Sequence, residues 1–171
     1  MEIAEFTQEH AGDLVAWFST QNESLMWGGR VFGWPLTENA VIARSLKPEV
    51  AFYVFIENEH MVGFIEFQRV SEKEMRFCRV AINPAMRGRG LGQAMVHLSI
   101  QHVKRISDVC FVSLAVFQHN IAAKACYEKA GFQVVNREPS YKLFHGEKWP
   151  LYQMELAVYE GIKGREHYAS L

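Results

Sequence analysis

The sequence predicts an α/β (α+β) protein in which helices cover one mixed β-sheet. Strand-like alternation and helix-like 3.6-residue periodicity replace one another along the chain, which is typical of this class. The 171 residues are 49% hydrophobic, enough for one buried core. No repeat, low-complexity tract or linker divides them, so we expect a single domain over 1–158 and a C-terminal tail over 159–171.

The first third of the chain predicts one short strand and two helices. A strand is expected over 1–6. A helix is expected over 8–18, because four apolar positions follow the i, i+3, i+4, i+7 rule: Ala11, Leu14, Val15 and Phe18. Glycines and a proline punctuate 20–37, which predicts a loop. A short helix over 38–47 ends before Pro48.

The middle of the chain predicts three strands. Two of them, 50–56 and 61–70, flank the polar turn 57–60 and are typical of a β-hairpin. A third covers 74–82. Its side chains alternate between the two faces of the strand, and one face carries Glu74, Arg76, Cys78 and Val80. Asn83-Pro84 ends this strand, because proline cannot donate to a sheet ladder.

The remaining elements alternate between the two periodicities. We expect a helix over 88–104, a strand over 110–117, a helix over 120–130, and strands over 131–136 and 150–158. The chain therefore contains about seven strands and about four helices.

Composition excludes several classes of protein. The net charge is −1, which gives no support for nucleic-acid binding through phosphate neutralisation. Three cysteines without a C-x-x-C pair fit neither a disulfide framework nor a zinc knuckle. His97 and His102 are five residues apart rather than four, which does not favour a metal site. The acidic N-terminus and the lack of a long apolar run predict a cytoplasmic protein without a membrane partner.

A glycine-rich turn between the predicted strand 74–82 and the next helix indicates phosphate binding. Glycines let the backbone approach an anion, and the unpaired N–H groups of a helix N-terminus point at it. Arg87 and Arg89 add charged donors. The spacing contains neither G-x-x-x-x-G-K-[ST] nor G-x-G-x-x-G, so a nucleotide-binding protein is a weaker alternative. The stretch matches R-x-x-G-x-G, with Gly90 and Gly92 as its glycines.

This loop resembles the acetyl-CoA pyrophosphate loop of the GNAT superfamily of N-acetyltransferases. A second motif, Asn120 to Phe132, resembles the N-x-x-A-x-x-x-Y-E-x-x-G-F helix of that superfamily. The resemblance implies a GNAT fold, with a mostly antiparallel sheet of six to seven strands that is splayed at a cofactor cleft, and acetyl-CoA as cosubstrate without a metal.

The resemblance also implies which residues bind the cofactor. The pantetheine arm would pair with the strand at Val80, Ala81 and Ile82. The pyrophosphate would be held by six consecutive loop residues: Arg87, Gly88, Arg89, Gly90, Leu91 and Gly92. Asn120 would contact the cofactor, although an asparagine before a helical run is also an ordinary N-cap.

Tyr127 occupies the position from which the family protonates the departing thiolate, and a core tyrosine is the alternative. The general base stays open. The family positions that carry glutamates in some members hold Ala115 and Arg76 here. The remaining candidates are Glu74, Glu66 and His119, and a water-relayed proton transfer needs no dedicated side chain.

For the acceptor we expect the segment 24–36 to contribute. Its Trp27, Phe32 and Trp34 would stack on the acceptor or pack onto the sheet. A glutamate would pair with the amine, and the candidates are Glu23, Glu38 and Glu66. The predicted function is transfer of acetyl from acetyl-CoA to a primary amine of a small molecule or peptide by direct attack. The alternative is a non-catalytic CoA-binding sensor, and either protein would be a monomer or a homodimer.

Overall fold

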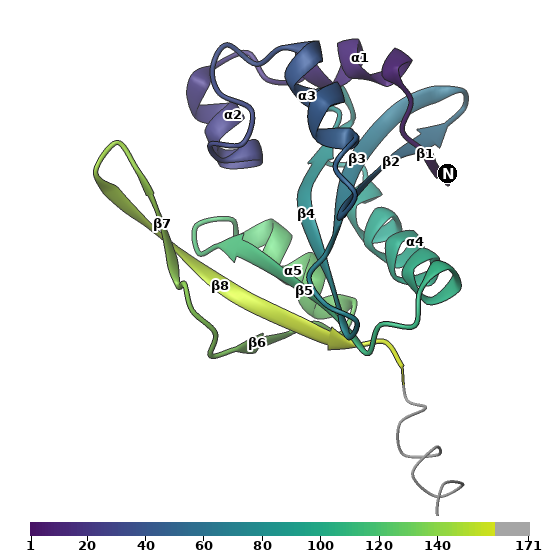
Figure 1. Cartoon of the computed structure of the whole chain (residues 1–171), viewed down its shortest axis with the longest axis vertical. Helices are drawn as coiled ribbons and strands as arrows, with labels where there is room; N and C mark the ends of the chain where they lie inside the picture. Colours follow the sequence, from purple (N-terminus) through teal and green to yellow (C-terminus); the bar gives the residue numbers. More distant parts are fainter. Residues whose placement is uncertain (160–171) are drawn as a thin grey trace, which may run out of the picture.

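The computed structural model describes residues 1–159 and shows an eight-stranded sheet with five α-helices (Figure 1). The strands are β1 (Glu2–Glu5), β2 (Val50–Glu57), β3 (His60–Arg69), β4 (Glu74–Ile82), β5 (Phe111–Phe117), β6 (Gln133–Val135), β7 (Tyr141–Phe144) and β8 (Glu147–Ala157). The helices are α1 (Ala11–Ala16), α2 (Gln21–Gly28), α3 (Glu38–Ser45), α4 (Leu91–Ile106) and α5 (Ile121–Lys129), with 3-10 turns at Gln8–His10 and Pro84–Met86.

The sheet order is β1-β2-β3-β4-β5-β8-β6, and β7 pairs with β8 outside this path. Every pairing is antiparallel except that of β4 with β5. The prediction of a mixed, mostly antiparallel sheet is therefore confirmed, with one strand more than expected.

Helices cover both faces of the sheet. On one face, α4 and α5 bury an apolar stripe against the central strands, and Met95, Val103 and Phe132 are part of this core. On the other face, α1 and α3 pack on β2 and β3 through a second cluster that contains Leu14, Val41 and Phe64. The strands β2 and β3 are thus buried from both sides, which explains their nearly continuous apolar sequence.

Three details differ from the sequence-based expectation. The predicted loop 20–37 contains α2, whose start is fixed by a capping box in which Thr20 Oγ1 accepts from the Glu23 N–H and the Glu23 carboxylate accepts from the Thr20 N–H. The helix α4 begins at Leu91 rather than at residue 88. The strand β7 was not predicted. Apart from Tyr159, the predicted tail 159–171 lies outside the described residues.

Within residues 1–159 no helix is long and apolar enough to cross a membrane. In the same part of the chain, no three His, Cys, Asp or Glu side chains are grouped as a metal site would require. Cys78, Cys110 and Cys126 are free thiols.

Candidate active site

The site is a cleft that opens where β4 and β5 separate. The two strands pair in parallel only from Glu74 to Arg76, opposite Phe111 to Ser113. Beyond these three positions β5 stays with β8 along its whole length, while β4 stays with β3. In Figure 1 the two halves of the sheet diverge from this point. After Arg76, one edge of β4 therefore lines a wall of the cleft, while the other edge stays paired with β3.

A β-bulge interrupts β4 within the cleft. Its partner positions run from Glu66↔Cys78 to Phe64↔Ala81, so Ile65 alone faces both Arg79 and Val80. Arg79 adopts a left-handed backbone conformation with φ of 53°. The extra residue reverses the alternation. Arg79 and Ala81 consequently share a face with Arg76 and Cys78, which corrects the predicted alternation that placed them on the opposite face from Cys78.

The glycine-rich turn lies at the end of β4 and leads into α4. Gly88 and Gly90 have φ values of 78° and 73°, a conformation that glycine adopts without strain. Gly90 is the N-cap of α4, and no side chain caps the helix. Since the first N–H groups of an α-helix lack intrahelical partners, they face outward here. Arg87 and Arg89 are exposed on either side of Gly88.

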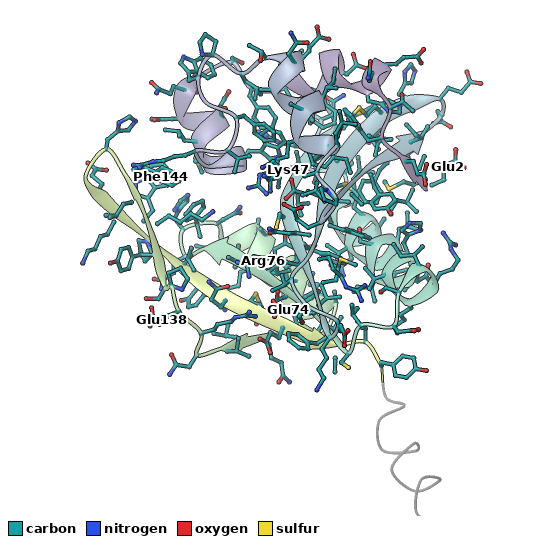
Figure 2. All side chains as sticks on the ribbon, in the orientation of Figure 1. Glu2, Lys47, Glu74, Arg76, Glu138 and Phe144 are labelled. Carbon is teal, nitrogen blue, oxygen red and sulfur yellow. The ribbon has the colours of Figure 1, made fainter. Side chains whose placement is uncertain are left out.

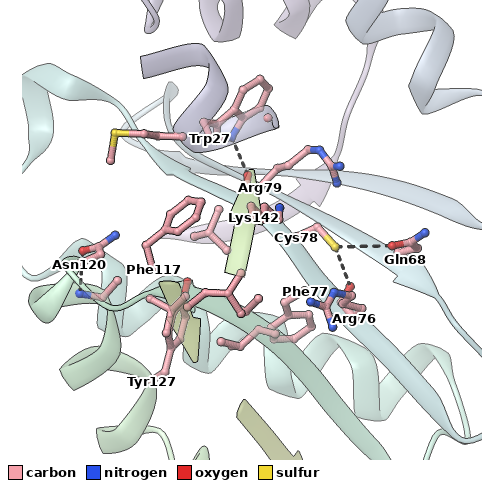
Figure 3. A pocket seen from close by; sticks show the side chains of 18 residues that line it. Trp27, Gln68, Arg76, Phe77, Cys78, Arg79, Phe117, Asn120, Tyr127 and Lys142 are labelled. Carbon is pink, nitrogen blue, oxygen red and sulfur yellow. Dashed lines mark hydrogen bonds between the residues drawn. The ribbon is translucent and has the colours of Figure 1, made fainter. Parts of the chain in front are cut away.

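Between the two walls lies a cavity of about 330 Å³. Its walls come from β4, β5, α5, α2 and β7 (Figure 3). The lining residues that bear on the chemistry are Trp27, Gln68, Arg76, Cys78, Arg79, Val80, Asn120, Tyr127 and Lys142.

Tyr127 comes from α5 and is 9% exposed. Burial, together with the neighbouring Cys126, raises the pKa of Tyr127 above its ordinary value, so its hydroxyl keeps its proton at neutral pH. Asn120 also lines the cavity, and its Oδ1 accepts a hydrogen bond from the Ala123 N–H at 3.2 Å. This is the N-cap role that was one of its two expected functions.

The bulge is held by contacts on both its main chain and its side chain. Trp27 Nε1 donates to the Arg79 carbonyl at 2.8 Å. The Arg79 guanidinium donates to Glu66 Oε2 at 2.5 Å, and Arg44 binds both oxygens of the same carboxylate at 2.6 and 3.0 Å. Glu66 is fully buried between these two arginines.

Two further cations reach the cavity. Arg76 projects from β4, and its guanidinium donates to Gln153 Oε1 at 3.2 Å. Lys142 projects from β7, close to the backbone of Gly29 at the end of α2. The Lys142 side chain is exposed along its length, but desolvation of its ammonium group lowers its pKa from the usual value, and the neighbouring charges of Arg79 and Arg76 act in the same direction. Figure 2 shows Arg76 on β4, near Glu74 of the same strand.

Comparison with protein families matches residues 13–132 to the acetyltransferase (GNAT) family. The chain belongs to this family. Mycothiol acetyltransferase of Corynebacterium glutamicum (strain R) is 30% identical over 127 residues, which cover 74% of this chain and 43% of that protein. The chain thus spans less than half the length of this GNAT relative.

Two other comparisons agree with the assignment. A putative ribosomal-protein alanine N-acetyltransferase of Bacillus subtilis (strain 168) is 27% identical over 114 residues, which cover 66% of this chain and 74% of that protein. Among solved structures, spermidine N-acetyltransferase of Vibrio cholerae in complex with CoA and spermine superposes with a TM-score of 0.76 at 14% identity, over 91% of this chain and 94% of that one. The latter likeness establishes the GNAT fold alone.

The structure brings together only some of the predicted site residues. Val80, Asn120, Tyr127 and Trp27 line the cavity, and the loop Arg87–Gly92 follows the same strand. Ala81 is buried in the second core cluster, and Ile82 packs against the first. Phe32 and Trp34 do not line the cavity: Phe32 is buried against Trp27, and Trp34 is 42% exposed.

The base candidates also lie outside the cavity. Glu74 accepts hydrogen bonds from Ser113 at 2.6 Å and from Arg137 at 2.8 and 2.9 Å. Glu66 is enclosed by its two arginines, and His119 stacks on Phe117 at the surface. Both carboxylates are bound by neighbouring arginines, and none of the three predicted base candidates lines the cavity.

Sequence reasoning missed Lys142, and it noted Arg76 only as a departure from a family pattern. Lys142 was missed because β7 is short. One signal was available, since His145 and Gly146 form a two-residue hairpin turn with φ of 51° and 79° between two alternating segments.

Proposed function

We propose that this GNAT protein is an acetyl-CoA-dependent N-acetyltransferase that uses a primary amine as acceptor. The observation that carries the proposal is that the cavity and the glycine-rich turn are joined by a single strand. One strand, β4, forms the wall of a cavity that Tyr127 reaches and then leads directly into the glycine-rich turn.

The chain's own residues fit the cofactor. The loop Arg87–Gly92 offers unpaired N–H groups, two exposed arginines and glycines whose positive φ lets the backbone approach a pyrophosphate. The unpaired edge of β4 at Val80–Ile82 offers main-chain groups to the pantetheine amides, as an added strand would use them.

Bound acetyl-CoA would supply an acetyl thioester, whose carbonyl carbon forms a C–N bond to the acceptor as its C–S bond breaks. The chain positions the reactants and holds a proton for the departing sulfur at the Tyr127 hydroxyl. Its raised pKa keeps this hydroxyl protonated. No carboxylate or imidazole among the described residues lines the cavity, so the amine loses its proton to solvent or to a bound water.

The proposal extends to the surroundings of the reaction. The acceptor is a small molecule or a peptide amine, and the reaction takes place in the cytoplasm, where the three free thiols stay reduced. The protein acts as a monomer or a homodimer, and 1–158 forms a single domain.

Acetyl-CoA-dependent thiol release with a panel of amines tests the proposal, with acetyl-CoA alone as the blank. We expect release that depends on the amine and is lost in Tyr127→Phe. Tight CoA binding without turnover across the panel would instead favour the sensor, which no comparison supports. A thermal shift with ATP but not with CoA would indicate a nucleotide-binding protein.

A further inference from the structure

All charged side chains that line the cavity are cations. Arg76, Arg79 and Lys142 belong to its wall, and among residues 1–159 no carboxylate does. The β4 bulge contributes to this arrangement, because it turns Arg79 to the face that already carries Arg76. Lys142 approaches from β7, so the positive charges come from two separate parts of the sheet (Figure 3).

The carboxylates next to these cations are already occupied. Glu66 binds both Arg79 and Arg44, so its single negative charge neutralises only one of the two arginines. In addition, Arg79 Nε is buried without a hydrogen-bond partner. The carboxylate of Glu74 lies on the same strand as Arg76, but its oxygens accept hydrogen bonds from Arg137 and Ser113 instead.

Arg76 and Lys142 have no ion pair within the described residues. The contact of Arg76 is to a neutral amide: Gln153 Nε2 donates to the Pro139 carbonyl at 2.8 Å, so its Oε1 is left to accept from Arg76. Lys142 donates to no acceptor in this part of the chain. These two cations are therefore the groups with charge to offer a ligand.

The cations do not belong to the phosphate loop. Arg76 lies six positions before Ile82, at the end of β4 remote from the glycine-rich turn, which is roughly 20 Å along an extended strand. The acetyl-CoA pyrophosphate would be held beyond Ile82. The charge of Arg76 is thus available for the acceptor side of the cleft.

The Trp27 ring of the wall offers no open face to a cationic acceptor. Both faces of the Trp27 ring are covered, by Phe18 at 4.3 Å and by Phe32 at 5.1 Å between ring centroids. The Trp27 N–H is bound to Arg79. A second ammonium group of a polyamine would meet the like charges of Arg76, Arg79 and Lys142 without a free face of Trp27 to offset them.

We propose that the acceptor is a small amine that also carries a carboxylate, and that Arg76 and Lys142 bind this carboxylate. The inference rests on the proposed function and names its substrate class. The cavity of about 330 Å³ also has to admit the thioester, so the acceptor is of amino-acid size rather than a protein.

The same charges help to explain why the cavity needs no general base. A bound ammonium repelled by Arg76, Arg79 and Lys142 has a lowered pKa, because like charges disfavour the charged form. The acceptor carboxylate offsets this repulsion at its own end of the molecule while the amine loses its proton.

The test compares acceptors that differ in one charge. Purified full-length protein is assayed with α-, β- and γ-amino acids, with the corresponding uncharged amides and with spermidine, each at several pH values so that kcat/KM refers to the neutral amine. We expect kcat/KM for at least one amino acid to exceed that for its amide by about tenfold or more. Arg76→Gln and Lys142→Gln should each reduce that ratio toward one.

Lys148→Gln is the matched control. Lys148 belongs to the same hairpin, but it lies over the Tyr141 ring, and strand alternation places it on the face opposite Lys142. In Lys148→Gln, the ratio of kcat/KM for the amino acid to kcat/KM for its amide should equal that of the wild type. The melting temperature of each variant reports whether it folds.

A second readout needs no turnover. Ligand-observed NMR with the CoA-saturated protein should detect the N-acetyl amino acid but not N-acetylspermidine, and the signal should weaken in the two variants. Preference for amides or spermidine, or a ratio unchanged by both variants, would overturn the inference. CoA binding with acetylation of spermidine alone would leave the proposed function standing and remove only this inference. Failure of every amine would count against the proposed function, and the NMR comparison would still decide between acid and polyamine.

Discussion

The indole N–H of Trp27 donates to the main-chain carbonyl of Arg79 over 2.8 Å, and this hydrogen bond ties α2 to the bulge of β4. The two residues are 52 positions apart in the chain. Because the Trp27 ring is also stacked between Phe18 and Phe32, α2 and the bulged strand form one packed unit.

Trp27→Phe removes this hydrogen bond and keeps most of the stacking. We expect the free energy of unfolding to fall by about 1 kcal/mol, and kcat to fall because the bulge is less firmly held. Urea denaturation and steady-state kinetics measure the two effects. Trp34→Phe alters an exposed ring and should change neither; a Trp27→Phe protein with unaltered kcat would mean that the tie is not needed for catalysis.

Tyr127→Phe removes the proposed proton donor from the cavity. We expect kcat to fall by about 10²-fold or more with little change in stability, because the phenyl ring retains its packing. Since burial raises the pKa of Tyr127, the wild-type hydroxyl stays protonated across the neutral range, and its contribution to kcat should be constant from pH 6 to 9.

Tyr53→Phe is the matched control for this variant. Tyr53 is buried and its pKa is likewise raised by burial, but it packs on Phe67 and His102 away from the cavity. Equal loss of kcat in both variants would show that Tyr127 acts through packing.

Gly90→Ala places a side chain at a residue with φ of 73°. Nothing lies within 4 Å of the added carbon, so the cost is conformational, about 1–2 kcal/mol. We expect the Kd for CoA, measured by calorimetry, to rise because the loop relaxes away from its anion-binding shape. Gly146→Ala is the matched control, because Gly146 has φ of 79° and equal space for a side chain at the tip of the β7–β8 hairpin. It should lower stability similarly and leave CoA affinity intact.

Glu74→Gln tests whether this buried carboxylate is structural. Burial alone would raise the pKa of Glu74, but the hydrogen bonds from Arg137 and Ser113 outweigh it and lower the pKa below 4.5. Because the pKa of Glu74 is lower in the folded than in the unfolded protein, its ionised carboxylate stabilises the fold at pH values above the unfolded pKa near 4.5. This contribution is lost as the pH falls through the folded-state pKa.

The wild type should therefore be more stable than Glu74→Gln at pH 7, and the difference should shrink below pH 4.5. We expect a difference of about 1–2 kcal/mol, because Arg137 is 35% exposed and solvent screens the pair. Guanidinium denaturation at several pH values measures it. If the variant keeps its stability and loses its kcat, Glu74 acts as a base after all.

Local sequence patterns were sufficient for most of the fold. Strands β2 to β5 and helices α3 to α5 lie within a few residues of their predicted bounds, because their apolar period continues over a whole element. The short elements α2 and β7 were not predicted. Their stability depends on tertiary contacts, such as the Arg30 guanidinium that donates to the Leu143 carbonyl at 3.1 Å.

The candidate site divides in the same way. The phosphate loop and Tyr127 belong to contiguous motifs, so the printed sequence is enough to find them. Arg76 and Lys142 are 66 positions apart and line the same cavity because the β7–β8 hairpin contacts the turn that follows α2. Glu66 and Glu74 were assigned to chemistry because a sequence does not reveal the arginines that enclose them.

The extra residue of β4 puts its two ends out of phase with each other. Before the bulge, Cys78 shares a sheet face with its partner Glu66; after it, Ala81 shares that face with Phe64. Deleting Arg79 would leave Val80 alone opposite Ile65, so Ala81 and Ile82 would keep their partners and their faces. We therefore expect a β4 shortened by this one residue to fold as a regular strand that has lost the cation bound to Glu66.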